Sequence, residues 1–332
     1  MPNTTKHHPA KFWDPEGDSI QCWLCPHRCT LSEGQRGLCL VRTVIDGKLV
    51  STVYALPSAL RVDPIEKKPL YHFLPGSQSF SLGTQGCNLK CEFCQNWHLS
   101  TQYGHATVQV SPEEIVSEAL KAECDSIAFT YNEPIIFAEY AMDIRDLASK
   151  AGIPCIMVTN GYITPKARKD VFKGIKAVNI DLKAFSNELY MKYTGAQLDP
   201  VLNTIKWCIE EGIHTEITTL IIPGVNDDPE MIQKECQWIS KHCGNDVALH
   251  ISAFHPDYKM KDYPRTSRSI LIRCNEIAKK CGLKYTYVGN YPGFDNNTYC
   301  PQCGEIILKR DLYHIEGNAS HMHKSPIIWS VS

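Results

Sequence analysis

The sequence predicts an α/β fold on a parallel sheet, because short apolar strand candidates alternate with helical segments through the middle of the chain. The strand candidates cover residues 80–83, 126–130, 155–159, 178–181, 216–220, 247–251 and 285–288. Such alternation predicts parallel strands joined by right-handed crossovers. Six or seven units fall short of the eight that close a TIM barrel. We therefore expect a partial, open TIM barrel.

Helix boundaries support the same alternation. A capping residue followed by proline occurs at residues 111–112, 164–165 and 228–229, which is the usual start of a helix. Glu114 completes a capping box with Ser111. Gly244 and Gly282 follow the last periodic residues of two helix candidates, as helix-ending glycines do.

The composition is that of an ordinary globular chain. It has 332 residues, 43% of them hydrophobic and 21% charged, with a formal net charge of −2. This charge supplies no basic field for nucleic acid or an acidic membrane, so nucleic acid is an unlikely partner. No apolar run approaches the roughly 20 residues that span a bilayer. The first residues have no apolar stretch of the secretory type, and we expect a cytoplasmic protein without a membrane partner.

The most informative motif is a CxxxCxxC run directly after the first strand candidate. Its cysteines are Cys87, Cys91 and Cys94. Three thiolates on one loop suit three irons of a [4Fe-4S] cluster, and they leave the fourth iron open to a substrate or cofactor. A zinc site would need a fourth ligand and usually has CxxC spacing.

This motif resembles that of the radical S-adenosylmethionine (SAM) superfamily, with the aromatic Phe93 just before the third cysteine. The wider string over residues 83–97 resembles the AmmeMemoRadiSam-system radical SAM enzymes, relatives of the pyruvate formate-lyase activating enzymes. The resemblance implies the same partial barrel and two cofactors, a [4Fe-4S] cluster and SAM.

The resemblance also implies roles for residues that follow the strand candidates, where chemistry gathers in such folds. Asn132 and Glu133 would contact the SAM amino group, which favours a charge-assisted hydrogen bond. Asn160 would contact the ribose or carboxylate, and Phe93 the adenine. The remaining implied residues are Asp181, which lines the active site, and the catalytic candidates Lys183 and His255.

The implied reaction is reductive cleavage of SAM to a 5′-deoxyadenosyl radical, which takes hydrogen from an unidentified substrate. It would need a one-electron reductant of the flavodoxin or ferredoxin type, and the family name implies partner proteins of the AmmeMemo system. An activating enzyme that installs a glycyl radical is the enzymatic alternative. A nucleic-acid-binding module is a further alternative, for which the charge gives little support.

Two cysteine-rich segments flank the predicted barrel of residues 76–295. The N-terminal segment, residues 1–75, contains Cys22, Cys25, Cys29 and Cys39. Four thiolates fit either structural zinc or an auxiliary iron–sulfur cluster, and His27 is a possible substitute for one of them.

The C-terminal segment, residues 296–332, contains half of a zinc ribbon, Cys300 and Cys303. Two thiolates cannot close a tetrahedral zinc shell. The soft ligands left downstream are His314, His321 and His323. Either histidines complete a mixed site or the site is lost.

Overall fold

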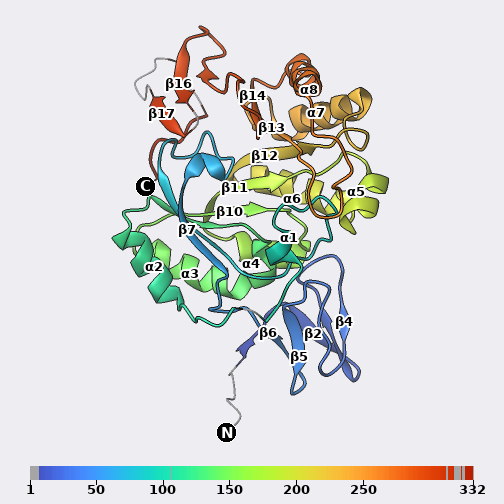
Figure 1. The fold of residues 1–332 in the computed structure, drawn as a ribbon. Coiled ribbons are helices and arrows are strands. Elements are labelled where there is room, and N and C mark those ends of the chain that lie inside the picture. The colour runs from blue at the N-terminus through green and yellow to red at the C-terminus, as the bar shows by residue number, and fades with distance from the viewer. Residues whose placement is uncertain (1–6, 105, 312, 318–322, 324–325, 332) are drawn as a thin grey trace.

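The computed structural model describes residues 7–104, 106–311, 313–317, 323 and 326–331. Its centre is an eight-stranded sheet in the order β14-β13-β12-β11-β10-β9-β8-β7 (Figure 1). The seven parallel strands are β8 (Gln78–Gly83), β9 (Ser126–Phe129), β10 (Cys155–Thr159), β11 (Ile175–Asp181), β12 (His214–Ile221), β13 (Ala248–Ala253) and β14 (Tyr285–Gly289). All seven predicted strands are therefore confirmed.

The eighth strand, β7 (Ala59–Pro64), pairs antiparallel with β8. It lies within the range 1–75 that the sequence assigned to the N-terminal segment. Among the described residues β14 pairs with β13 alone, so the sheet does not close into a barrel. The expected α/β fold on a mostly parallel sheet is confirmed.

Helices connect successive parallel strands and lie along the outside of the sheet (Figure 1). The longer ones are α2 (Pro112–Lys121), α3 (Ala138–Lys150), α4 (Pro165–Phe172), α5 (Asn187–Thr194), α6 (Leu198–Glu210), α7 (Pro229–Cys243) and α8 (Arg268–Lys280). The predicted capping box is present, with Ser111 and Glu114 each bonding the other's backbone N–H. The other two cap-then-proline starts are also confirmed, at α4 and α7. A single large apolar core fills the space between these helices and the sheet.

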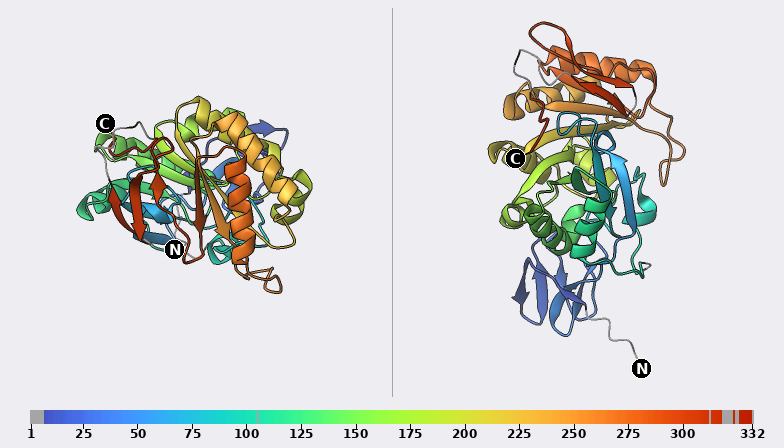
Figure 2. Two further views of the ribbon diagram at one scale, coloured as in Figure 1. Left: turned by 90° about the horizontal axis from the view of Figure 1, so that it is seen from above. Right: turned by 90° about the vertical axis from the view of Figure 1, so that its left-hand side faces the viewer.

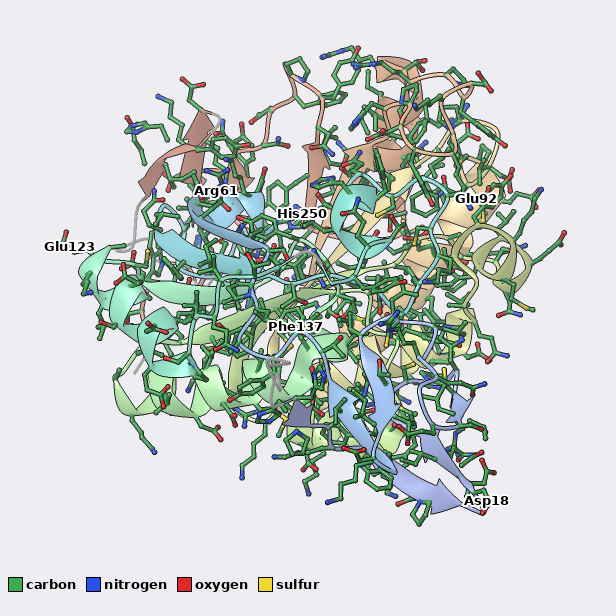
Figure 3. All side chains as sticks on the ribbon, turned by 60° about the horizontal axis from the view of Figure 1, so that its bottom comes forward. Asp18, Arg61, Glu92, Glu123, Phe137 and His250 are labelled. Carbon is green, nitrogen blue, oxygen red and sulfur yellow. The ribbon has the colours of Figure 1, made fainter. Side chains whose placement is uncertain are left out.

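Short three-stranded sheets occupy the two ends of the molecule (Figure 2). The N-terminal pair consists of β1 (His8–Pro9), β6 (Lys48–Ser51) and β5 (Arg42–Ile45), and of β2 (Trp13–Glu16), β3 (Ser19–Cys22) and β4 (Thr30–Leu31). The C-terminal sheet consists of β15 (Thr298–Tyr299), β16 (Ile306–Asp311) and β17 (His314–Gly317). Figure 3 shows Asp18 at the far tip of the N-terminal part and Phe137 inside the molecule. None of the described helices has the length and apolar character needed to cross a membrane.

A buried ion pair attaches the N-terminal sheets to the rest of the protein. Arg42 Nη1 lies 3.0 Å from both carboxylate oxygens of Glu139 on α3, and the two side chains are 2% and 1% exposed. The Lys11 N–H also donates to Glu139, at 2.7 Å. Because removing one partner leaves the other charge buried and unpaired, this contact is sensitive to mutation.

We predict that Glu139→Ala lowers the free energy of unfolding by about 3–5 kcal/mol, the usual cost of breaking a buried pair. Urea unfolding followed by circular dichroism measures the change. Lys121→Ala is the control, because Lys121 and Glu118 form an exposed pair at 2.7 Å, and such pairs contribute roughly 0–1 kcal/mol. Equal losses in the two variants would contradict the prediction.

Candidate functional site

The carboxyl ends of the parallel strands surround a cavity of about 590 Å³, within the roughly 300–1,000 Å³ typical of small-molecule sites. The structure brings nine of the ten residues predicted for the central site to its wall. They are Cys87, Cys91, Phe93, Cys94, Asn132, Glu133, Asn160, Asp181 and Lys183. They lie at the carboxyl end of β11 or in the loops that follow β8, β9, β10 and β11.

The tenth residue, His255, does not line the cavity. Its Nδ1 lies 3.0 Å from Nε2 of Gln95, and Gln95 does line the cavity. His255 therefore contacts Gln95 next to the cysteine loop, and its role near the substrate stays a prediction.

The cysteine loop is held in place by Asn132, the third residue after β9. The Asn132 side chain accepts from the Thr84 N–H at 2.9 Å and donates to the carbonyls of Gln85 and Gly86 at 3.2 and 2.9 Å. Gly83 permits this approach, because an added Cβ would lie 2.6 Å from the Thr130 carbonyl oxygen. Sequence reasoning assigned Asn132 to SAM, and that contact stays a prediction, whereas its hydrogen bonds to the loop are present in the structure.

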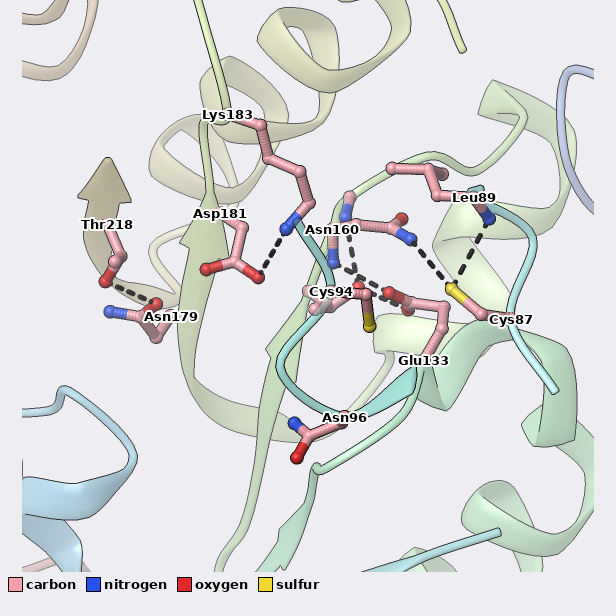
Figure 4. Close-up of polar contacts among 12 residues, drawn as sticks. Cys87, Leu89, Cys94, Asn96, Glu133, Asn160, Asn179, Asp181, Lys183 and Thr218 are labelled. Atoms are coloured by element: carbon pink, nitrogen blue, oxygen red, sulfur yellow. Dashed lines mark hydrogen bonds and ion pairs between the residues drawn. The ribbon is translucent and has the colours of Figure 1, made fainter. Parts of the chain in front are cut away.

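Glu133 connects the end of β9 to the end of β10 (Figure 4). Its Oε1 accepts from Thr159 Oγ1 at 2.6 Å and Ile135 N at 3.1 Å, and its Oε2 accepts from Asn160 N at 2.7 Å. Burial raises the pKa of this carboxyl to about 7, although these hydrogen bonds favour the ionised form. A carboxylate oxygen has two lone pairs, so Oε2 keeps one acceptor position for a ligand.

Asn160 links this network to the first cysteine. Its Nδ2 donates to Asn88 Oδ1 at 2.8 Å and lies 3.9 Å from Cys87 Sγ (Figure 4). The Leu89 N–H also points at that sulfur, at 3.4 Å. Two donors directed at one sulfur favour its thiolate, the form that binds metal.

The chemistry of the three cysteines fits a cluster. Burial raises the pKa of the Cys91 thiol to about 12 and that of the Cys87 thiol well above its usual range, so metal binding must release protons. The three sulfurs do not all lie within 4.8 Å of one another. In the described part of the chain, the group of three ligand atoms that meets this limit lies elsewhere. Sulfurs so separated suit a cluster, in which each thiolate binds a different iron.

Lys183 and Asp181 form an ion pair at the wall beside Cys91, with Nζ 3.1 Å from Oδ2 (Figure 4). Burial would lower the pKa of Lys183, but Asp181 and the Cys91 thiol raise it further, so it stays above its ordinary value. The Lys183 Nζ also lies 6.0 Å from the centre of the Phe93 ring. Lys183 is therefore a cation that can hold an anionic group, and its catalytic role stays a prediction.

Sequence reasoning missed the wall formed by Asp63, Lys68 and Tyr131. Lys68 Nζ lies 2.7 Å from Asp63 Oδ2, and the Tyr131 hydroxyl donates to the same oxygen at 2.6 Å. Tyr131 has a φ of 68°, an uncommon conformation that often marks functional sites. Asp63 and Lys68 carried no signal, because β7 reads as part of the N-terminal segment.

The C-terminal cysteines form a compact group with one histidine. The ligand atoms of Cys300, Cys303 and His323 all lie within 4.8 Å of one another. His314 is in β17 and pairs with Glu316 at 3.6 Å, and His321 lies outside the described residues. The four N-terminal cysteines, Cys22, Cys25, Cys29 and Cys39, also come together around a small cavity.

The sequence is similar to several known proteins. The sequence pattern of the radical SAM superfamily matches residues 81–236. An uncharacterized protein of Methanocaldococcus jannaschii is 39% identical over 310 residues, covering 92% of each chain. The pyruvate formate-lyase 1-activating enzyme of Escherichia coli is 20% identical over 222 residues, covering 61% of this chain and 89% of that enzyme.

The fold has a solved counterpart. A radical SAM methyltransferase from Sphaerobacter thermophilus superposes with a TM-score of 0.52 at 15% identity, covering 70% of this chain and 71% of that structure. At this identity the similarity concerns the fold alone.

We predict that Asn132→Ala loosens the cysteine loop and reduces metal retention. Three backbone groups of the loop would lose partners, at about 1–3 kcal/mol for each buried unpaired group. Iron per chain after anaerobic reconstitution and desalting measures the effect. Asn203→Ala, on the exposed surface of α6, is the control. Wild-type iron retention by Asn132→Ala would show that the loop needs no such support.

We predict that Cys300, Cys303 and His323 bind one zinc ion and that Cys303→Ser lowers both zinc content and thermal stability, since structural zinc contributes its binding free energy to folding. Elemental analysis and thermal unfolding with and without a chelator measure the two effects. Cys281→Ser, which removes a thiol outside this group, is the control. A zinc content unchanged by Cys303→Ser would exclude the site.

Proposed function

We propose that the chain is a radical SAM enzyme, on the match of residues 81–236 to that superfamily, and that Cys87, Cys91 and Cys94 hold the [4Fe-4S] cluster that enzymes of this superfamily use with SAM. One observation supports the proposal most: nine residues predicted at or after the ends of four strands line one cavity. When bound there, the cluster and SAM would supply a 5′-deoxyadenosyl radical that takes hydrogen from a substrate.

The residues of the chain would bind and orient SAM rather than exchange protons with it. The free acceptor position on Glu133 Oε2 suits the amino group of SAM, since a buried carboxylate favours a cationic donor. Lys183 suits the SAM carboxylate, because it stays an ammonium ion beside Asp181 at 3.1 Å. Phe93 is buried and lies beside this cation, where a planar adenine can pack. Holding these groups on short loops between rigid strands limits the freedom of the reacting atoms.

We assign the chain more finely to the AmmeMemoRadiSam group, on the string of residues 83–97. This assignment implies that the protein acts with partner proteins of the AmmeMemo system on a substrate that is not identified. The protein would take its electrons from a one-electron donor of the flavodoxin or ferredoxin type. A glycyl-radical activating enzyme is the second candidate, supported by the match that covers 89% of the E. coli activating enzyme.

We predict that Cys87→Ala, Cys91→Ala and Cys94→Ala combined abolish reductive cleavage of SAM and remove about four irons per chain. Production of 5′-deoxyadenosine and methionine under dithionite measures cleavage, and iron analysis measures the cluster. Cys281→Ser should match the wild type in both. A triple variant that still cleaves SAM would refute the assignment.

We predict that Glu133→Gln weakens SAM binding by about 1–3 kcal/mol, the cost of losing a charged hydrogen bond, while iron content falls less. Isothermal titration of the reconstituted protein with SAM gives the affinity. Glu188→Gln, an exposed residue of α5, is the control. An unchanged affinity would remove Glu133 from the SAM contacts.

A further inference from the structure

Four cysteines of the N-terminal segment surround a second, smaller cavity that the proposed function does not use. Cys22 ends β3, Cys25 and Cys29 lie in the turn after it, and Cys39 lies shortly before β5. The cavity measures about 20 Å³, space for roughly one water centre. Gly37 and Arg42 also line this cavity.

The spacing of the sulfurs argues against zinc. A tetrahedral zinc ion lies about 2.3 Å from each thiolate, so its sulfurs lie roughly 3.8 Å apart with no space between them. Across the described ranges, Cys300, Cys303 and His323 form the single group of three ligands within 4.8 Å. No three of the N-terminal sulfurs therefore converge on one ion position, and the same holds for those of the CxxxCxxC loop. An iron–sulfur cluster needs this wider arrangement, because its thiolates bind different irons.

Two neighbours of the sulfurs point to an anionic group in that space. A Cβ added to Gly37 would lie 3.7 Å from Sγ of both Cys29 and Cys39, and Gly37 does not have a left-handed φ. The absence of a side chain at Gly37 therefore leaves space beside these two sulfurs and is not required by the backbone conformation. The Arg42 side chain is 2% exposed, and its Nε–H has no hydrogen-bond partner among the described residues. A thiolate or sulfide of a cluster would accept that hydrogen bond, as buried donors require.

The two cysteine loops contact each other directly. His27, between Cys25 and Cys29, donates from Nε2 to the Asn88 carbonyl oxygen at 2.8 Å. On the other side of Cys87, a Cβ added to Gly86 would overlap the Cys39 carbonyl oxygen. Both residues that flank Cys87 therefore touch the N-terminal loop.

We propose that Cys22, Cys25, Cys29 and Cys39 bind a second iron–sulfur cluster that passes electrons to the cluster at Cys87, Cys91 and Cys94. One electron moves in each transfer. A low-potential protein donor of the flavodoxin or ferredoxin class is oxidised, the N-terminal cluster is reduced and then reoxidised, and the central cluster is reduced. No bond forms or breaks, and no proton moves.

The outer side of the N-terminal cavity is open to such a donor. Cys25 and Cys29 are partly exposed, and Leu38 beside them is 50% exposed. The relay rests on the proposed function, because its electron acceptor is the proposed central cluster. The binding of metal by the four N-terminal cysteines does not depend on that function.

The first experiment identifies this metal independently of SAM chemistry. The full-length protein carrying Cys87→Ala, Cys91→Ala and Cys94→Ala is reconstituted anaerobically with iron, sulfide and zinc. We expect about two or four irons and as many sulfides per chain, with an electron paramagnetic resonance signal after reduction that SAM leaves unchanged. Adding Cys25→Ser and Cys29→Ser should remove this iron, and adding Cys281→Ser should not.

One equivalent of zinc without iron, or no metal, would overturn the proposal even if the wild type cleaves SAM. Should the triple variant fail to fold, Cys25→Ser with Cys29→Ser in the wild-type background must lose the same irons. Full wild-type iron content in that double variant would overturn it equally.

The second experiment tests the relay. The Cys25→Ser, Cys29→Ser variant should cleave SAM at least about tenfold more slowly than wild type with reduced flavodoxin. With dithionite, which is small enough to enter the central cavity directly, its rate should stay within about twofold. A merely structural role would slow both reactions alike, and that result would overturn the relay.

Discussion

The residue pair Asn132 and Glu133, just after β9, is the constraint on which the central site depends. Asn132 bonds the backbone of residues 84–86, which lead into the cysteine loop. Glu133 bonds Thr159 and Asn160 at the end of β10, and Asn160 continues to Asn88 and Cys87. Because buried polar groups are costly unless paired, these contacts fix three strand ends relative to one another. The position of Cys87 follows from them.

The opposite side of the cavity depends on another buried carboxylate, Glu216 of β12. It accepts the N–H groups of Tyr71 and His72 at 3.0 and 2.8 Å, and Nε2 of His214 and His250 lies at 3.0 and 2.6 Å. Burial alone would raise the pKa of Glu216, but the histidine hydrogen bonds lower it well below its usual range. The segment before β8 is thereby tied across the sheet, and its neighbours Asp63 and Lys68 reach the cavity wall.

The three cysteine groups differ in how closely their ligand atoms approach one another, and this difference bears on the kind of metal centre that each could hold. The group of Cys300, Cys303 and His323 is compact enough for one ion, whereas no three sulfurs of the other two groups come within 4.8 Å of one another among the described residues. A single ion needs converging ligands, and a cluster needs separated ones. The contacts of His27 with Asn88 and of Cys39 with Gly86 also bring the two separated groups together. The N-terminal sheets, attached through Arg42 and Glu139, therefore pack against the loop that carries Cys87.

The sequence by itself determined the seven parallel strands, the capped helices and most of one wall of the site. It could do so because apolar periodicity and capping act over a few residues, and because the ends of parallel strands share one edge of a sheet. Only the tertiary structure decided that β7 joins the sheet, that Asp63 and Lys68 line the cavity, and that His255 contacts Gln95 without lining the cavity. It also decided which cysteines converge. These outcomes depend on packing between segments that are far apart in the chain, such as the 160 residues that separate Gln95 from His255. Patterns that act over a few residues do not report such contacts.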